Sequence, residues 1–415
     1  MASEIKVSVV FPIYNAEDSL EEAVRSVMEQ SLNNIEIICV NDGSTDGSLQ
    51  VLKRLSGEDN RIKVISQENL GAGAARNAGI GVAVGEYMMF LDPDDKLAAK
   101  NVLLRLFEYA SETKTDICGG NIVYNDTVGS GEGYKNFATC GVMDFSQFQD
   151  CFFHVRFIIS RKLLLDNNIL YPKLKRFQDP PFLLNAMVAA GRFSYINIPV
   201  YIYTRHLTSR EYSYEGIRDL LIGHCDVLKI ALKEGLNQLF LGIIEVARNN
   251  YYLEFYKHLY YYENQELEEY IREYEALIQK GPVEDKDRYL IISRQQSSVH
   301  KRFLSERRKI DTALRSEIVI IYGAGFWGKE IKKYMDQKCP DKECYIATTD
   351  GGNDTFSIKE LFGIVPKASV IVAVDDKYVA AMGETAHRCG FENVYPLIYL
   401  NVNVDYWIHP WLLEN

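Results

Sequence analysis

YMMFLDPDD, residues 87–95, joins an apolar run directly to three carboxylates. An uninterrupted apolar run of this length predicts a buried strand. Ligands of α/β proteins bind at the carboxyl ends of the strands, and Asp92, Asp94 and Asp95 fall at such an end. Three neighbouring acids repel one another unless a cation arrives, and a divalent ion shared with a phosphorylated ligand meets that need. The alternative at this point is a solvated acidic turn in which Pro93 sets the bend.

Strands and helices are expected to alternate before this stretch. Runs rich in β-branched residues predict strands at residues 6–12, 35–40 and 62–65. Apolar residues then recur at helical spacing after the first two strands, and Asn15 is interpreted as the N-cap of the first helix. This alternation predicts an α/β fold with a mostly parallel sheet and helices on both faces.

The chain of 415 residues is too long for one ordinary domain, and 47% apolar residues supply ample material for a core. Composition predicts three parts. Residues 1–211 carry the alternating strands and helices, residues 212–314 form a helical region poor in glycine and proline, and residues 315–415 form a second, small Rossmann-like α/β domain.

The third part carries a glycine-rich sequence in the context of a nucleotide-binding turn. A strand at 318–322 leads into GAGFWG, residues 323–328, and a helix is expected to follow. Asp350 lies at about the distance where a dinucleotide site places its acid. Phe326 and Trp327 put bulk where a pyrophosphate would pass. Nucleotide binding and a purely structural or oligomerising role therefore both stay open, and so does a homo-oligomer.

Net charge and the lack of apolar segments restrict the partners. A net charge of −11 argues against nucleic-acid binding. The eight cysteines lack paired spacing and are interpreted as reduced thiols of a cytoplasmic protein. No signal peptide is expected, nor any bilayer-spanning helix. Residues 286–309 hold eight basic and two acidic residues among apolar ones. They form either an amphipathic helix that attaches the protein to the inner face of the membrane or a solvated helix between domains.

Polar segments follow several of the expected strands. They are DGSTD at 42–46, NLGAGAARN at 69–77, the acidic stretch at 92–95, and QDPPF at 178–182. Each has an ordinary structural explanation, such as a helix cap for Asp42 or Asp179 and a surface ion pair for Arg76. Their order along the chain favours one shared site over four separate coincidences.

VVFPIYN at 9–15, VNDGSTDG at 40–47, NLGAGAARN at 69–77 and FLDPDD at 90–95 resemble family 2 glycosyltransferases with the GT-A fold. The resemblance covers the first of the three parts. It implies an enzyme that moves a sugar from a nucleotide-sugar, usually a UDP-sugar, to an acceptor hydroxyl with inversion. It further implies that the acceptor is a glycan or a lipid-linked glycan.

The resemblance also implies roles for individual residues of the donor site. Pro12, Tyr14 and Asp42 would line the nucleoside site, Arg76 would lie beside the donor, Asp92 would contact the ribose or sugar, and Asp94 would ligate Mn²⁺ or Mg²⁺. His206, just after a strand ending at residue 203, would complete the metal shell or bind the diphosphate. A structural surface histidine is the alternative for His206.

Asp179 would be the base that takes the proton of the acceptor hydroxyl. Family members usually carry Glu-Asp at this point, whereas this chain has Gln178 before Asp179. The resemblance therefore implies a retained base and leaves open whether Gln178 alters the positioning of the acceptor.

Two other functions use a similar sheet. A nucleotidyltransferase that makes the sugar nucleotide would normally carry a glycine-rich phosphate loop with Lys or Arg after the first strand, where this chain has PIYN at 12–15. A non-catalytic protein that binds sugar nucleotides would have no need of a base such as Asp179.

Overall fold

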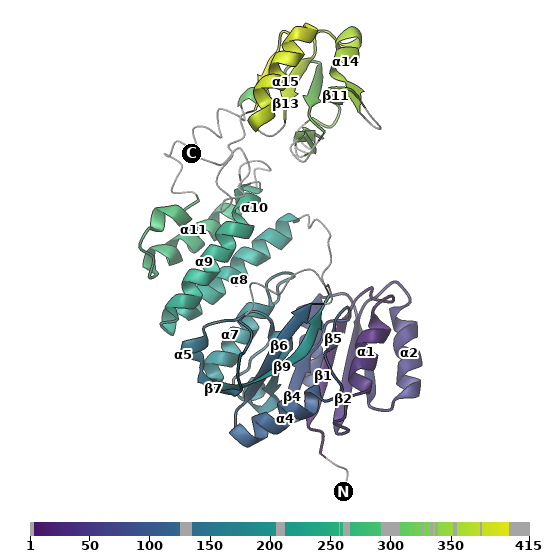
Figure 1. Cartoon of the computed structure of the whole chain (residues 1–415), viewed down its shortest axis with the longest axis vertical. Coiled ribbons are helices and arrows are strands. Elements are labelled where there is room, and N and C mark those ends of the chain that lie inside the picture. Colours follow the sequence, from purple (N-terminus) through teal and green to yellow (C-terminus); the bar gives the residue numbers. More distant parts are fainter. Residues whose placement is uncertain are drawn as a thin grey trace. The chain divides into compact units, whose positions relative to one another are not determined.

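The computed structural model describes residues 4–124, 135–204, 212–256, 258–259, 266–291, 308–324, 328–329, 331–332, 335–336, 339–351, 355–373 and 376–397. The chain divides into two compact units, Met1–Ile243 and Ile244–Asn415 (Figure 1). The three-part division at residues 211 and 314 stays a prediction.

A nine-stranded sheet runs through the first unit (Figure 1). The strands follow the order β3-β2-β1-β4-β8-β6-β9-β5, and β7 pairs with β9. They are β1 (Val7–Ile13), β2 (Ile35–Asp42), β3 (Ile62–Gln67), β4 (Tyr87–Phe90), β5 (Lys96–Leu97), β6 (Ile117–Tyr124), β7 (Gly141–Asp144), β8 (Phe157–Ser160) and β9 (Arg192–Tyr203). The first four strands along the chain pair with one another in parallel, as the sequence predicted, and every antiparallel pair includes β8 or β9.

Helices cover both faces of this sheet. They are α1 (Leu20–Met28), α2 (Ser48–Glu58), α3 (Ala72–Val82), α4 (Val102–Thr113), α5 (Phe145–Phe148), α6 (Arg161–Asp166) and α7 (Asp179–Ala190), with a short 3-10 turn at His154–Arg156. Helix α8 (Tyr214–Lys233) packs against α7, and α9 (Asn237–Asn250) follows it along the chain. Helices α1, α2 and α4 share a core with Val9 and Phe11 of β1. Val10 points to the opposite face and meets α3, so the fully buried strands β1, β2 and β4 are covered on both sides.

Helix α3 approaches the sheet closely because it carries a glycine at the contact. A Cβ atom on Gly79 would lie 2.3 Å from Cγ1 of Val10. Gly79 therefore serves helix–sheet packing, whereas Gly73 within the segment 69–77 faces Tyr171 and Pro172.

The expected N-cap at Asn15 is wrong, because α1 begins only at Leu20 after Ser19. Asn15 has a positive φ of 49° and fastens the loop after β1 to the loop after β2. Its Oδ1 accepts a hydrogen bond of 2.8 Å from the backbone N–H of Thr45, and its own N–H donates to Oγ of Ser44 at 3.1 Å. A short polar side chain tolerates the left-handed conformation, so Asn15 suits a loop junction as well as a cap.

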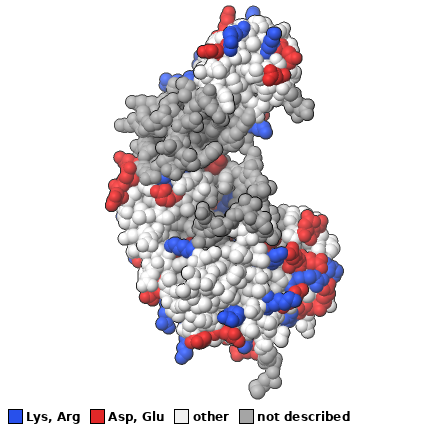
Figure 2. Space-filling view, in the orientation of Figure 1, with Lys and Arg blue, Asp and Glu red and all other residues white. Residues whose placement is uncertain are grey.

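Acidic and basic side chains intermingle over α1 and α2 in the space-filling view (Figure 2). Arg25 and Arg54 each contact both Glu21 and Glu58 there. All four side chains are well exposed, so each pair contributes only ~0–1 kcal/mol to stability. We assign this cluster to solubility and to the clamping of two surface helices.

The second unit contains a parallel five-stranded sheet in the order β12-β11-β10-β13-β14. Its strands are β10 (Ile318–Tyr322), β11 (Glu343–Thr348), β12 (Phe356–Ser357), β13 (Ser369–Val372) and β14 (Val394–Pro396); its helical elements include α10 (Tyr252–Tyr256), α11 (Glu266–Lys280), the 3-10 turn Lys286–Tyr289, α14 (Ile358–Ile364) and α15 (Asp376–Cys389). The predicted small α/β domain is confirmed. Gly323 has a φ of 132°, and a Cβ atom on Gly328 would lie 1.7 Å from the carbonyl oxygen of Gly323, so these two glycines approach each other closely. Residues 325–327 lie outside the described residues.

Most of the basic segment 286–309 lies outside the described residues, which stop at Ile291 and resume at Arg308. In the described part, Leu290 and Ile291 are buried, so these two apolar side chains face the interior of the second unit. Within the described residues, no helix combines the length and the apolar character needed to cross a bilayer.

Candidate active site

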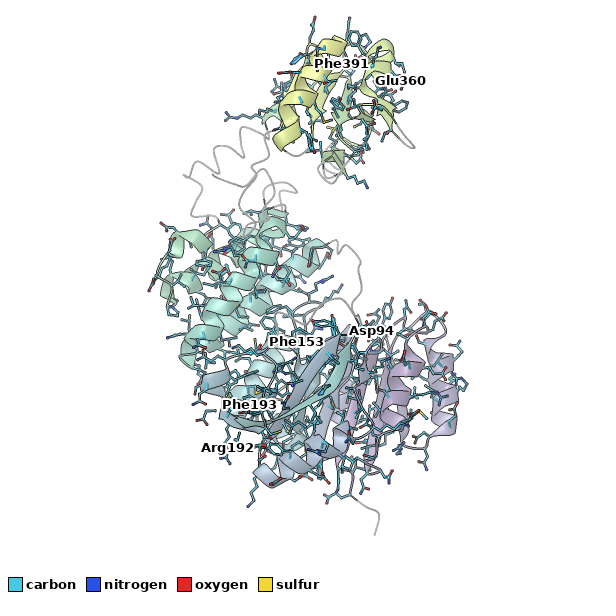
Figure 3. The ribbon with its side chains drawn as sticks, in the orientation of Figure 1. Asp94, Phe153, Arg192, Phe193, Glu360 and Phe391 are labelled. Carbon is cyan, nitrogen blue, oxygen red and sulfur yellow. The ribbon has the colours of Figure 1, made fainter. Side chains whose placement is uncertain are left out.

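The polar residues predicted from the sequence gather at the carboxyl edge of the parallel strands. Asp42 ends β2, and Asp92 and Asp94 follow directly on β4, which pairs with β1 beside β2. Figure 3 shows Asp94 and Phe153 at one end of the sheet, and Arg192, the first residue of β9, towards the other. This edge is where α/β sheets bind ligands.

Asp42 organises the loop in front of α3. Its side chain is buried, and its Oδ1 accepts hydrogen bonds from Nε2 of Gln67 at 2.7 Å and from the backbone N–H of Leu70 at 3.0 Å. Its Oδ2 accepts from the N–H of Gly71 at 2.8 Å. Both oxygens therefore bond within the chain, and Asp42 fixes the loop in front of α3.

Tyr14 and Pro12 differ in their access to solvent. Tyr14 is 48% exposed in the loop after β1, whereas Pro12 is buried within β1 and pairs with Val40. Leu70, in the loop that Asp42 holds, is 67% exposed. Tyr14 and Leu70 are exposed in loops at the same edge of the sheet, where they supply apolar surface. The sequence analysis had not singled out Leu70.

Arg76 lies between the two carboxylates that resemblance assigns to opposite ends of the reaction. Its Nη2 donates to Oδ1 of Asp92 at 2.7 Å, and its Nη1 donates to Oδ1 of Asp179 at 3.0 Å. The guanidinium is only 4% exposed and lies over the ring of Tyr171 at 5.2 Å. Burial lowers the pKa of Arg76, but Asp179 and Asp92 raise it more, so the group stays charged. Arg76 therefore links Asp92 to Asp179 through two ion pairs with its buried guanidinium.

Asp179 is the first residue of α7 and keeps an open edge, since its side chain is 34% exposed. Pro180 and Pro181 occupy the first turn, where a missing N–H is harmless. Burial raises the pKa of Asp179 above its usual value, and the charge of Arg76 opposes that rise. A carboxylate with a raised pKa beside a ligand-binding edge is suited to accept a proton.

His154 is a site residue that the sequence had not indicated. It is buried, and its Nδ1 lies 3.8 Å from Oδ1 of Asp179. The rings of Phe90, Tyr171 and Phe182 surround it. Burial, helped by Arg76, lowers the pKa of His154 to about 3, so the imidazole is neutral. Asp179 therefore borders an uncharged aromatic wall on one side and a cation on the other.

Asp95, which had no assigned role, faces the protein interior. Its Oδ2 accepts from the Tyr201 hydroxyl at 2.6 Å, and its Oδ1 accepts from the N–H of Thr204 at 2.7 Å. Burial raises the pKa of Asp95 to about 7, and the negative charges of Asp92 and Asp94 raise it further. The hydrogen bonds from Tyr201 and Thr204 act in the opposite direction and lower this pKa. Asp95 therefore ties the end of β9 to the acidic turn. No sequence signal separates this inward carboxylate from its outward neighbour Asp94.

Asp94 is partly exposed, next to Asp92. These carboxylates are the hard oxygen donors that Mn²⁺ and Mg²⁺ accept, and such ions often take few protein ligands and complete their shell with phosphate oxygens. The donor set therefore fits the predicted ion. Among the described residues, no group of three His, Cys, Asp or Glu side chains is already assembled around one point. His206, the second predicted ligand, lies outside the described residues.

Comparison with known proteins agrees with this geometry. Residues 8–171 match the model of the glycosyl transferase family 2. Glycosyltransferase GlyG of Streptococcus pneumoniae is 29% identical over 64% of this chain and 92% of its own length. The uncharacterized glycosyltransferase EpsJ of Bacillus subtilis is 32% identical over 49% of this chain and 62% of its length. The poly(ribitol-phosphate) beta-glucosyltransferase of Bacillus spizizenii is 32% identical over 46% of this chain and 31% of its length.

Among solved structures, Staphylococcus aureus TarS 1–349 in complex with UDP-GlcNAc superposes with a TM-score of 0.55. It is 22% identical, and the match covers 73% of this chain and 87% of TarS 1–349. This likeness concerns the fold alone.

The match over residues 8–171 and the similarity to glycosyltransferase GlyG indicate a sugar-transferring enzyme. The carboxylates at the carboxyl edge of the sheet agree with that class. The matched part of the chain, residues 8–171, is a family 2 glycosyltransferase domain. This placement sets aside the nucleotidyltransferase and the non-catalytic alternatives.

Proposed function

We propose that the enzyme transfers a sugar from a UDP-sugar to a hydroxyl of a glycan or lipid-linked glycan, with inversion, by direct displacement. The observation that carries this proposal is the bridge from Asp92 through Arg76 to Asp179. The buried guanidinium of Arg76 binds both Asp92, which follows β4, and Asp179, which begins α7. Two similar proteins, TarS in complex with UDP-GlcNAc and the poly(ribitol-phosphate) beta-glucosyltransferase, add support for a UDP-linked donor and a polymeric acceptor.

In this reaction, the acceptor oxygen forms a bond to the anomeric carbon while the bond from that carbon to the diphosphate breaks. The open edge of Asp179 takes the proton of the acceptor hydroxyl as the new bond forms. General base catalysis of this kind contributes ~10²–10⁴-fold to the rate. Asp92 binds the sugar or ribose hydroxyls of the donor, and Arg76 holds both carboxylates in register.

On the donor side, Tyr14 and the loop held by Asp42 bind the nucleoside. The open loops carrying Tyr14 and Leu70 offer apolar surface to a base. Asp94 would hold Mn²⁺ or Mg²⁺, and the bound ion would neutralise the charge that develops on the leaving diphosphate.

The donor class can be tested by incubating the protein with labelled UDP-sugars and extracted glycan or lipid-linked acceptors. We expect acceptor-dependent release of UDP from one donor. GDP- and CMP-sugars serve as controls. Release from a GDP-sugar in preference to every UDP-sugar would contradict the assignment of the nucleotide.

Removal of divalent metal should abolish transfer. Addition of EDTA is expected to lower the rate at least ~100-fold, because neutralising the leaving diphosphate contributes several kcal/mol to transition-state stabilisation. Mn²⁺ or Mg²⁺ should restore the rate, and Asp94→Asn should raise the metal concentration needed for half-maximal activity. The measurement is UDP release during a metal titration. Unchanged transfer in EDTA would remove Asp94 from its proposed role.

A further inference from the structure

The segment in front of Asp179 is attached to α8, a helix that lies beyond the part matched by the family model. The backbone N–H of Lys175 donates to Oδ2 of Asp219 on α8 at 2.8 Å. Asp219 is buried, and Arg218 bonds its other oxygen. A buried carboxylate that takes a backbone N–H fixes that loop more firmly than a solvated contact does. The loop before α7 is therefore held from outside the sheet.

Phe177, two residues before Asp179, has a backbone conformation that costs energy. Its φ is 61°, in the left-handed region that a bulky residue rarely adopts. A cost of ~1–3 kcal/mol is typical of such a residue, which persists only where its surroundings enforce it. Neither glycine nor asparagine occupies this position, so the conformation must be enforced by packing.

Helix α8 provides that packing. The Phe177 ring stacks on the His224 ring with centroids 4.0 Å apart and planes 19° apart. His224 is fully buried, and its Nδ1 lies 2.7 Å from the carbonyl oxygen of Leu220. Because a carbonyl oxygen only accepts, Nδ1 carries the hydrogen. Burial lowers the pKa of His224 to about 4, so the stacked ring is neutral.

Gly223 makes room for Phe177. A Cβ atom at Gly223 would lie 2.8 Å from Cδ1 and 3.0 Å from the carbonyl oxygen of Phe177. A glycine inside a helix costs ~0.5–1 kcal/mol relative to alanine. Two features that lower stability therefore meet at one contact: the left-handed backbone of Phe177 and the glycine within α8 at position 223. Phe177 lies two residues before the proposed base, Asp179.

We propose that Phe177 is a positioning residue for sugar transfer and that Asp219, Gly223 and His224 of α8 hold it so that Asp179 faces the acceptor. We call this contact the α8 clasp. The proposal rests on the proposed function, since it assumes that Asp179 is the base. On this proposal, α8 contributes to the geometry of the active site and is not merely a connection to the following helices. Displacement of a catalytic group by about 1 Å costs ~100-fold in rate, so small shifts at Phe177 have measurable effects.

The test compares two substitutions that add the same methyl group to a helical glycine. Gly223→Ala forces Phe177 to move, whereas Gly242→Ala on α9 meets no atom within 4 Å. We expect Gly223→Ala to lower kcat ~10–100-fold, with the KM of the donor and the Kd of UDP changed by less than about 2-fold. Gly242→Ala should keep the kcat of the wild type. His224→Ala, which removes the stack without adding bulk, should act like Gly223→Ala and serves if that variant does not fold.

A double-mutant cycle separates positioning from general destabilisation. Combined with Phe177→Gly, which lifts the left-handed strain and removes the ring, His224→Ala should cost little further activity, because the ring that His224 stacks on is already gone and interacting residues are not additive. Additive losses, or a normal kcat in both Gly223→Ala and His224→Ala, would overturn the clasp. Parallel loss of kcat and of UDP binding would also overturn it. Asp179→Asn is measured alongside: if it stays active, the base assignment fails, whereas an inactive Asp179→Asn with normal clasp variants rejects the clasp alone.

Discussion

Asp179→Asn is expected to lower kcat by ~10²–10⁴-fold, because the amide cannot take the proton of the acceptor hydroxyl. This loss corresponds to ~3–5 kcal/mol of transition-state stabilisation. The side chain keeps its shape, and its Oδ1 still accepts from Nη1 of Arg76. Binding of UDP should therefore change by less than about 2-fold, and the melting temperature should move little. The measurements are single-turnover transfer and UDP binding by calorimetry.

The matched control is Asp166→Asn at the end of α6. Asp166 is exposed and pairs with Lys162 one helical turn away, a kind of contact that contributes only ~0.3–0.5 kcal/mol. This variant should transfer sugar at the rate of the wild type. Full activity in Asp179→Asn would end the assignment of the base.

Arg76→Met is expected to have the second largest effect, because it removes the cation between Asp92 and Asp179. The base is the ionised form of Asp179, so activity falls as pH drops through its pKa. Arg76 opposes the rise of that pKa, and its removal should move the acid limb of kcat/KM upward by ~1–3 pH units. The measurement is a pH profile of kcat/KM from about pH 5 to pH 9.

Arg76→Met should also lower the free energy of unfolding, since a charge-assisted hydrogen bond contributes ~1.5–3 kcal/mol. Arg54→Met is the control, because Arg54 is exposed and pairs only with surface glutamates. It should leave the pH profile unchanged and change the free energy of unfolding by less than ~1 kcal/mol. An acid limb of Arg76→Met that coincides with that of the wild type would show that Arg76 does not tune Asp179.

The parallel strands of the first unit were predictable because β1, β2 and β4 are buried on both faces, whereas β5, β6, β7 and β8 had not been expected. Each core strand is a near-continuous apolar run, and polar residues begin where the run ends, as at Phe90 and Asp92. The same rule located β10 and the small sheet of the second unit. The sequence carried less information about Asn15, since one side-chain type suits both a helix cap and a loop in the left-handed conformation.

The arrangement within the site was only partly predictable. Arg76 was recognised but was expected beside the donor, because nothing local reveals an ion pair with a residue 103 positions further along the chain. His154 is a lone histidine between Phe153 and Val155, without a motif. The left-handed Phe177 cannot be foreseen from its own residue type. All three depend on long-range packing, which residue patterns do not encode.

The stereochemistry of the product tests the central claim most directly. Direct displacement with Asp179 as base attaches the acceptor to the face of the anomeric carbon opposite the leaving diphosphate. NMR of the purified product, formed from the donor that supports UDP release, should show an anomeric configuration opposite to that of the donor. Retention of the donor configuration would contradict the account.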